Sequence, residues 1–154
     1  MELDDFDRRL LEALQQDNRQ TGDELAAKVG LSAAACLRRA QRLREIGAIV
    51  RDVALLAPEA TGRRLTVIVL VTVQRDSPDA NARFKAAMLA APEVTQCHYV
   101  TGPADYVLTV AVEDMDAYQR FTQRCLSGAS IKRFDSLVSM DRVKFETALP
   151  VAQD

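Results

Sequence analysis

Four arginines lie within one short segment of the chain, residues 32–44, and no acidic residue separates them. A guanidinium group binds phosphate, and it can donate two hydrogen bonds to the edge of a guanine. At about 100° per residue, three of these arginines share one side of a helix with a small residue, while apolar residues share the other. We therefore predict that this helix enters the major groove of DNA. The side that faces DNA carries Ala35, Arg38, Arg39 and Arg42.

Three arginines on a helix would by themselves more often be a solvated surface, but the preceding residues favour DNA binding. Thr21 and Glu24 have the spacing of a capping box that starts a short helix, and Gly30 is suited to end it. Ser32 then caps the arginine-bearing helix. Two helices joined by so short a turn predict a helix-turn-helix. The residues predicted to contact DNA are Thr21, Ser32, Ala34, Ala35, Arg38, Arg39, Arg42 and Arg51.

The composition fits a globular protein that binds nucleic acid through a local patch. Of 154 residues, 48% are hydrophobic and 27% are charged, with a net charge of −2. Residues 31–64 hold 7 basic and 3 acidic side chains, a net charge of +4. No apolar run of about 18 residues and no signal peptide is present. The three cysteines form no C-x-x-C pair, so we expect buried thiols in a cytoplasmic protein with no membrane partner.

The first fifty residues account for a helical domain. Asp4 can cap a first helix whose apolar residues, Phe6 to Leu14, recur at helical spacing. Residues 48–56 favour an extended segment, which could form a small wing with Arg51 against phosphate. Residues 57–64 contain the turn residues of a linker. We therefore expect a helix-turn-helix domain at 1–50, an extended linker or wing at 51–64 and a second domain at 65–154.

From Leu65 the pattern becomes that of a sheet. Residues 65–73 are rich in β-branched side chains without polar alternation, which predicts a strand covered on both faces. The order β-α-β-β-α-β predicts an α+β, ferredoxin-like domain. Its later elements are a helix opened by Asp76-Ser77-Pro78-Asp79 and stopped by Pro92, strands at 94–100 and 106–112 around a turn at 102–104, a helix capped by Asp114, and a strand at 131–143.

Two helices cover only one face of such a four-stranded sheet. Apolar residues on the other face would stay exposed to water, and a large exposed apolar patch usually marks an interface. At ~25 cal/mol per Å², burying several hundred Å² contributes about 10 kcal/mol before the entropy of association. We therefore expect a homodimer whose symmetry presents two recognition helices to two half-sites of an operator.

Along nearly the whole chain, the residues resemble those of the Lrp/AsnC family of bacterial and archaeal transcriptional regulators. The ordered set and its spacing carry this resemblance rather than any single motif. The matching residues are Leu3-Asp4, Asp7-Arg8, Leu14, Asp17-Asn18-Arg19, Glu24-Leu25-Ala26, Val29-Gly30-Leu31-Ser32, Cys36, Arg39, Arg42-Leu43, Gly47, Ile49, Gly62, Cys97-His98-Tyr99-Val100-Thr101-Gly102 and Asp105-Tyr106.

The resemblance implies dimers that often assemble further, for example into an octamer, and whose DNA binding or assembly responds to an amino acid or related small metabolite. It implies no cofactor. Gly102 would let backbone amides approach a carboxylate, and Asp105 could accept from an ammonium group. The alternative is a plain hairpin turn, in which these residue types are common. By position, the effector residues are Tyr99, Thr101, Gly102, Asp105, Tyr106, Ser136, Leu137 and Ser139.

Two segments depart from the family pattern. Residues 33–35 are alanines where family members often have prolines and a threonine, so Ala34 would offer only apolar contacts to thymine methyl groups. Ala129-Ser130-Ile131 stands where a Pro-Gly-Val turn is common in the family. This difference would alter the rim of the effector pocket or the contacts between dimers.

The sequence also raises three other interpretations: a metal site, an enzyme and an architectural DNA-binding protein. His98 has no further metal ligands at workable spacing, so no metal site is expected. Some relatives of the family are sirohaem decarboxylases, but no nucleophile–base pair is visible among the acid–base groups His98, Tyr99, Asp105 and Tyr106, so we do not expect an enzyme. An architectural DNA-binding protein without an effector is the third interpretation.

Overall fold

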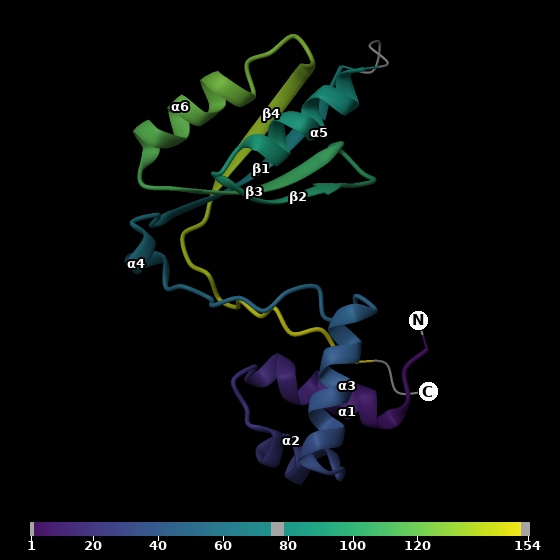
Figure 1. Cartoon of the computed structure of the whole chain (residues 1–154). Coiled ribbons are helices and arrows are strands. Elements are labelled where there is room, and N and C mark those ends of the chain that lie inside the picture. Colours follow the sequence, from purple (N-terminus) through teal and green to yellow (C-terminus); the bar gives the residue numbers. More distant parts are fainter. Residues whose placement is uncertain (1, 75–78, 152–154) are drawn as a thin grey trace. The chain divides into compact units, whose positions relative to one another are not determined.

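The computed structural model describes residues 2–74 and 79–151. The chain divides into two compact units, shown in Figure 1. The helical unit comprises Met1–Leu55 and Lys144–Asp154, and the sheet unit comprises Leu56–Val143.

The C-terminal segment from Lys144 belongs to the helical unit, whereas the sequence had placed it in the second domain. Gln15 holds it there. The side-chain amide of Gln15 donates to the carbonyl oxygen of Leu149 at 2.9 Å and accepts the backbone N–H of Leu149 at 2.7 Å. This pairing joins residues 134 positions apart, so no local pattern in the sequence announces it.

In the described residues the helical unit contains three helices, each starting at its predicted cap. Asp4 accepts from the N–H of Asp7, and Ser32 from that of Ala35; Thr21 and Glu24 form the predicted capping box. Gly30 adopts the left-handed conformation, with φ of 82°. The helices are α1 (Asp5–Gln16), α2 (Gly22–Val29) and α3 (Ala33–Glu45), and their shared core contains Leu10, Ala13, Leu25, Val29, Cys36, Ala40 and Leu43.

The expected wing does not form. Residues 46–57, all of them described, contain no strand, and Arg51 is exposed. The linker instead forms one short helix, α4 (Pro58–Thr61), with Pro58 at its first position and Gly62 after its end.

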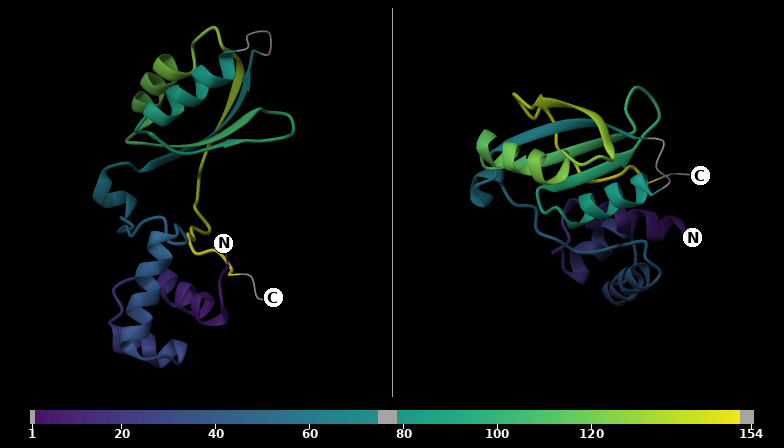
Figure 2. Two further views of the ribbon diagram at one scale, coloured as in Figure 1. Left: turned by 45° about the vertical axis from the view of Figure 1, so that its right-hand side comes forward. Right: turned by 90° about the horizontal axis from the view of Figure 1, so that it is seen from above.

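The sheet unit has the predicted ferredoxin-like order. Its four strands are antiparallel in the order β2-β3-β1-β4, and two helices lie on one face of the sheet, as Figures 1 and 2 show. The elements are β1 (Leu65–Val73), α5 (Ala80–Ala90), β2 (Val94–Tyr99), β3 (Tyr106–Val112), α6 (Met115–Cys125) and β4 (Ile131–Val138).

Two predicted boundaries differ in the structure. The last strand ends at Val138 and not at Val143, because its pairing with β1 ends at Val67 and residues 139–143 continue as exposed or half-buried coil. Helix α5 begins at Ala80, and Asp79 makes no side-chain capping bond; Asp76-Ser77-Pro78 lies outside the described residues. Asp114 does cap α6, accepting from the N–H of Ala117 at 2.8 Å.

The two faces of the sheet have different surroundings. Val67, Val69 and Val71 are fully buried under α5 and α6, together with aromatic and apolar residues of those helices. On the other face, which α5 and α6 do not cover, Ile68 and Leu70 stay half-buried. The pattern that predicted a strand apolar on both sides is therefore confirmed, and one of its apolar faces is open within this unit.

Candidate functional site

The outward face of α3 agrees in part with the predicted one, since Arg38 and Arg42 are exposed and Arg39 is half-buried. Ala34, Arg38 and Gln41 are exposed, and Arg38 makes no hydrogen bond or ion pair with any described residue. Leu37, which the helical arithmetic had placed on the apolar side, is 54% exposed. Leu37 and Gln41, which were not among the predicted contacts, therefore also lie on the exposed side of α3, one helical turn from Ala34 and Arg38.

Arg39 and Arg42 are held by carboxylates of α1. Arg39 Nη1 lies 2.8 Å from Asp4 Oδ2 and 2.8 Å from Asp7 Oδ1, and Arg42 Nη1 lies 3.0 Å from Asp7 Oδ2. Asp7 is 2% exposed. The carboxylates of Asp7 and Asp4, which accept hydrogen bonds from Arg39, raise the pKa of the Arg39 guanidinium.

The other predicted DNA contacts have local partners or lie in coil. The Thr21 hydroxyl donates to Glu24 Oε2 at 2.9 Å, and the Ser32 hydroxyl accepts from the N–H of Ala35, which is half-buried. Arg51 is exposed in the coil after α3. The two hydroxyls thus stabilise the start of each helix while lying on its exposed side.

The predicted effector residues fall into two groups on opposite edges of the sheet. Tyr99 pairs with Tyr106 at the β2 edge, whereas Ser136 lies on β4 at the other edge. With strands about 4.8 Å apart, three strand spacings separate them by about 14 Å. One copy of the chain therefore does not bring the whole predicted set together.

At the β2–β3 turn, Thr101 and Gly102 are exposed, and Gly102 has φ of 138°, a conformation that suits glycine. Asp105 is 8% exposed, and its Oδ2 accepts the N–H of Val73 at 3.0 Å. That oxygen therefore supports the sheet, which was not expected of a residue assigned to an ammonium group.

The predicted residues Ser136 and Leu137 point to opposite faces of β4, and Ser139 follows the end of the strand. The Ser136 hydroxyl lies 2.5 Å from that of Tyr118 on α6. Leu137 is exposed on the face opposite the helices, where it pairs with Ile68. The Ser139 N–H donates to the carbonyl oxygen of Thr66 at 2.9 Å.

A hollow of about 430 Å³ lies between α5 and β2. Tyr99 and Tyr106 contribute to it, with their ring centroids 5.0 Å apart, and Lys85 Nζ lies 5.5 Å from the Tyr99 ring centroid. Cys97, expected to be a buried thiol, is exposed there, although partial burial still raises its pKa. The lining residues are Lys85, Met88, Leu89, Val94, Thr95, Gln96, Cys97, Tyr99 and Tyr106.

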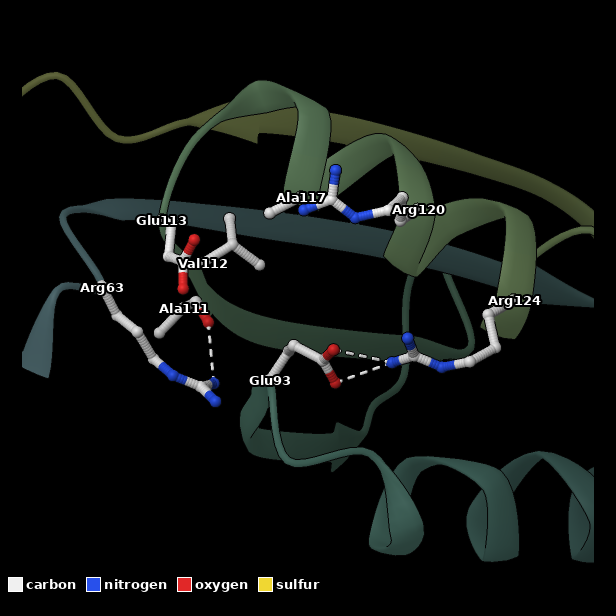
Figure 3. A pocket seen from close by; sticks show the side chains of 8 residues that line it. All are labelled: Arg63, Glu93, Ala111, Val112, Glu113, Ala117, Arg120 and Arg124. Carbon is white, nitrogen blue, oxygen red and sulfur yellow. Dashed lines mark hydrogen bonds and ion pairs between the residues drawn. The ribbon is translucent and has the colours of Figure 1, made fainter.

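A second hollow of about 210 Å³ is lined largely by charged side chains (Figure 3). Arg124 Nη2 donates to both carboxylate oxygens of Glu93, at 2.7 and 2.8 Å, and Arg63 Nη1 donates to the carbonyl oxygens of Pro92 and Ala111. Although burial opposes it, Arg124 lowers the pKa of Glu93. These bonds tie α6 and the segment before β1 to the start of β2, and none of the predicted effector residues lines this hollow.

Neither a cluster of metal-ligating side chains nor a membrane-spanning helix occurs among the described residues. No group of three or more His, Cys, Asp or Glu side chains within them could hold a metal ion. None of the helices that the structure describes is long and apolar enough to cross a bilayer.

Two family models match the chain. The AsnC-type helix-turn-helix domain matches residues 3–44, and the Lrp/AsnC ligand binding domain matches residues 66–149. An uncharacterised HTH-type transcriptional regulator of Sinorhizobium fredii is 47% identical, over 98% of this chain and 90% of its own length. The leucine-responsive regulatory protein of Salmonella typhimurium is 38% identical, over 97% of this chain and 92% of its own length.

Solved structures agree with these relatives. A transcriptional regulator of Neisseria meningitidis in complex with L-Met matches with a TM-score of 0.91 and 33% identity, over 97% of each chain. An AsnC family regulator of Agrobacterium tumefaciens matches with a TM-score of 0.89 and 36% identity, over 96% of this chain and 97% of its own. The relatives are named as transcriptional regulators, which points to a protein that is not an enzyme. The chain belongs to the Lrp/AsnC family of transcriptional regulators, with an N-terminal helix-turn-helix and a C-terminal ligand-binding domain.

Proposed function

We propose that the chain regulates transcription by inserting α3 into the major groove of an operator. The observation that carries this proposal is a helix-turn-helix with a side-chain cap at the start of both helices. Its α3 exposes Ala34 and Arg38 on one face, and Arg38 has no hydrogen-bond or ion-pair partner among the described residues. Arg38 can bind guanine or phosphate, and Ala34 can approach thymine methyl groups. Leu37 and Gln41 extend this face. The remaining candidates for contact with the DNA backbone flank this face: Thr21, Ser32, Ala35, Arg39, Arg42 and Arg51.

Fluorescence anisotropy with a labelled duplex tests this proposal. Arg38→Ala should weaken binding by about 1–3 kcal/mol if Arg38 contacts a base, or lower the salt slope by about one unit if it contacts a phosphate. Arg120→Ala is the matched control, because Arg120 is also exposed but lies on α6 of the sheet unit. Equal binding by both variants and the unmodified chain would refute the assigned face.

We further propose that the open face of the sheet pairs with that of a second copy, so that two recognition helices meet two half-sites. Ile68, Leu70 and Val107 on this face support the proposal, because each is apolar and only half-buried. Further assembly, as into an octamer, would add contacts outside this face. A dimer also offers a way to bring the β2-edge and β4-edge effector residues together, which one copy does not do.

For the effector, we propose an amino acid or related metabolite bound near the β2–β3 turn. The match to a ligand-binding domain supports this, as does the hollow beside Tyr99 and Tyr106. The test is thermal denaturation with each amino acid in turn. A ligand at 100 times its Kd should add about 2.7 kcal/mol of stability. Stabilisation together with altered duplex affinity is the expected result; the absence of both with every amino acid would favour an architectural DNA-binding protein.

A further inference from the structure

The arginines of α3 differ in how their charge is balanced. Arg38 is exposed and makes no hydrogen bond or ion pair with a described residue, whereas Arg39 and Arg42 both donate to Asp7. Arg39 also donates to Asp4 at 2.8 Å. Asp7 lies on α1, so these contacts cross from the first helix to the recognition helix, 32 and 35 residues away.

The cluster carries more acid than base. Its hollow, of about 440 Å³, is lined by Glu2, Asp4, Asp7, Arg39 and Arg42, which together carry a net charge of −1. Arg39 is 30% exposed and Arg42 48% exposed, so both guanidinium groups still reach the surface. A DNA phosphate that approached them would also meet the paired carboxylates.

We propose that Asp4 and Asp7 set the specificity of DNA binding by cancelling the charge of Arg39 and Arg42. Non-specific affinity comes from arginines and lysines that neutralise phosphates. Because these two arginines are already neutralised, the helix attracts arbitrary DNA less strongly than its arginine count suggests. Recognition then depends more on Arg38 and its neighbours. This inference rests on the proposed insertion of α3 into DNA.

The experiment compares the unmodified 154-residue chain with Asp4→Asn, Asp7→Asn and Asp5→Asn. Asn keeps the N-cap function at position 4 while removing the charge. Asp5 lies on the same turn but pairs with Arg8, so Asp5→Asn gives the same change in net charge without touching Arg39 or Arg42. Each variant binds two labelled duplexes, one selected by the unmodified chain and one of scrambled sequence, between 50 and 200 mM KCl.

Asp4→Asn removes one of the two carboxylates beside Arg39 and should steepen the salt slope on the scrambled duplex by less than about one unit, whereas Asp7→Asn, which removes the carboxylate shared by Arg39 and Arg42, should steepen it by up to about two. Each freed arginine should add a further roughly three- to fourfold loss of affinity across that salt range. The ratio of selected to scrambled affinity should fall, while Asp5→Asn stays close to the unmodified chain. A purely structural role would change stability without steepening the slope.

The inference is overturned if Asp4→Asn, shown by circular dichroism to be folded, has the same salt slope as Asp5→Asn. This comparison applies even if Asp7→Asn fails to fold. If Arg38→Ala weakens binding in the same assay, the proposed function stands while this inference falls. If the unmodified chain binds neither duplex, both fall together.

Discussion

Asp105 illustrates how one side chain can look like a ligand contact and act as a structural one. Its carboxylate lies under the β2–β3 turn and accepts the N–H of Val73 at 3.0 Å, and its backbone N–H donates to the carbonyl oxygen of Val71. The bond from Val73 satisfies a buried backbone donor near the end of β1. Any effect of an Asp105 substitution on ligand binding must therefore be separated from its effect on folding.

Asp105→Ala should lower the free energy of unfolding by about 1–3 kcal/mol in the absence of ligand, because the N–H of Val73 loses its acceptor. Chemical denaturation measures this change. Asp135→Ala is the control, because Asp135 is exposed on β4 and pairs only at the surface with Arg133, so its loss should cost less than about 1 kcal/mol. Equal losses of unfolding free energy in the two variants would show that the bond from Val73 to Asp105 adds no more stability than a surface ion pair.

Asp4 gives the helical unit a pH dependence. The N–H of Asp7, and after it the Arg39 guanidinium, lower the pKa of Asp4 below its ordinary value of 3.8. A carboxylate whose pKa is lower in the folded state stabilises that state above its unfolded pKa, and the stabilisation is lost as the pH falls through the folded pKa. The unmodified chain should therefore lose stability more steeply than Asp4→Asn below about pH 4. Parallel acid titrations of the two proteins would contradict this.

At the scale of elements, the helix caps could be predicted from the sequence, whereas the side-chain contacts between different elements could not. Thr21, Ser32 and Asp114 bond to residues three positions away, so the sequence displays each cap directly. Asp7 pairs with arginines of α3, and Gln15 pairs with the C-terminal segment. Both contacts join residues far apart in the sequence, so no local sequence pattern indicates them.

The division of the effector residues could have been foreseen. The ferredoxin-like strand order places β2 and β4 at opposite edges of the sheet, so Tyr99 and Ser136 could never be neighbours in one copy. Leu37 was misplaced for another reason. An angular projection assigns a residue such as Leu37 to the apolar side of the helix, but the neighbouring helices cover only part of that side, so Leu37 stays exposed.

The packing of α2 against α3 depends on the absence of a side chain at Gly22. A Cβ there would lie 3.2 Å from the Cβ of Ala33 and 3.2 Å from Leu37 Cδ1. Gly22→Val should therefore push the helices apart and lower the free energy of unfolding by about 1–3 kcal/mol. Ala27→Val, on the exposed side of α2, is the control and should cost no more than the lower helix propensity of valine. Equal unfolding free energies for the two variants would argue against this close approach.

At the scale of the whole molecule, the open sheet face predicts self-association. Leu70→Lys places a charge in the middle of that face and should shift the protein toward monomer, as measured by sedimentation equilibrium. Leu89→Lys introduces the same change on α5, where Leu89 is already exposed away from this face, and should leave the assembly intact. A dimer that survives Leu70→Lys would place the interface elsewhere.

The central claim is that two copies of this chain bind a defined DNA sequence through paired α3 helices. Selection of bound sequences from a pool of randomised duplexes, using the unmodified chain, tests it most directly. The account predicts enrichment of an inverted repeat whose half-sites lie about one helical turn, or a multiple of it, apart, and loss of that enrichment with Arg38→Ala. A pool that stays random after repeated rounds, or the same motif with Arg38→Ala, would contradict it.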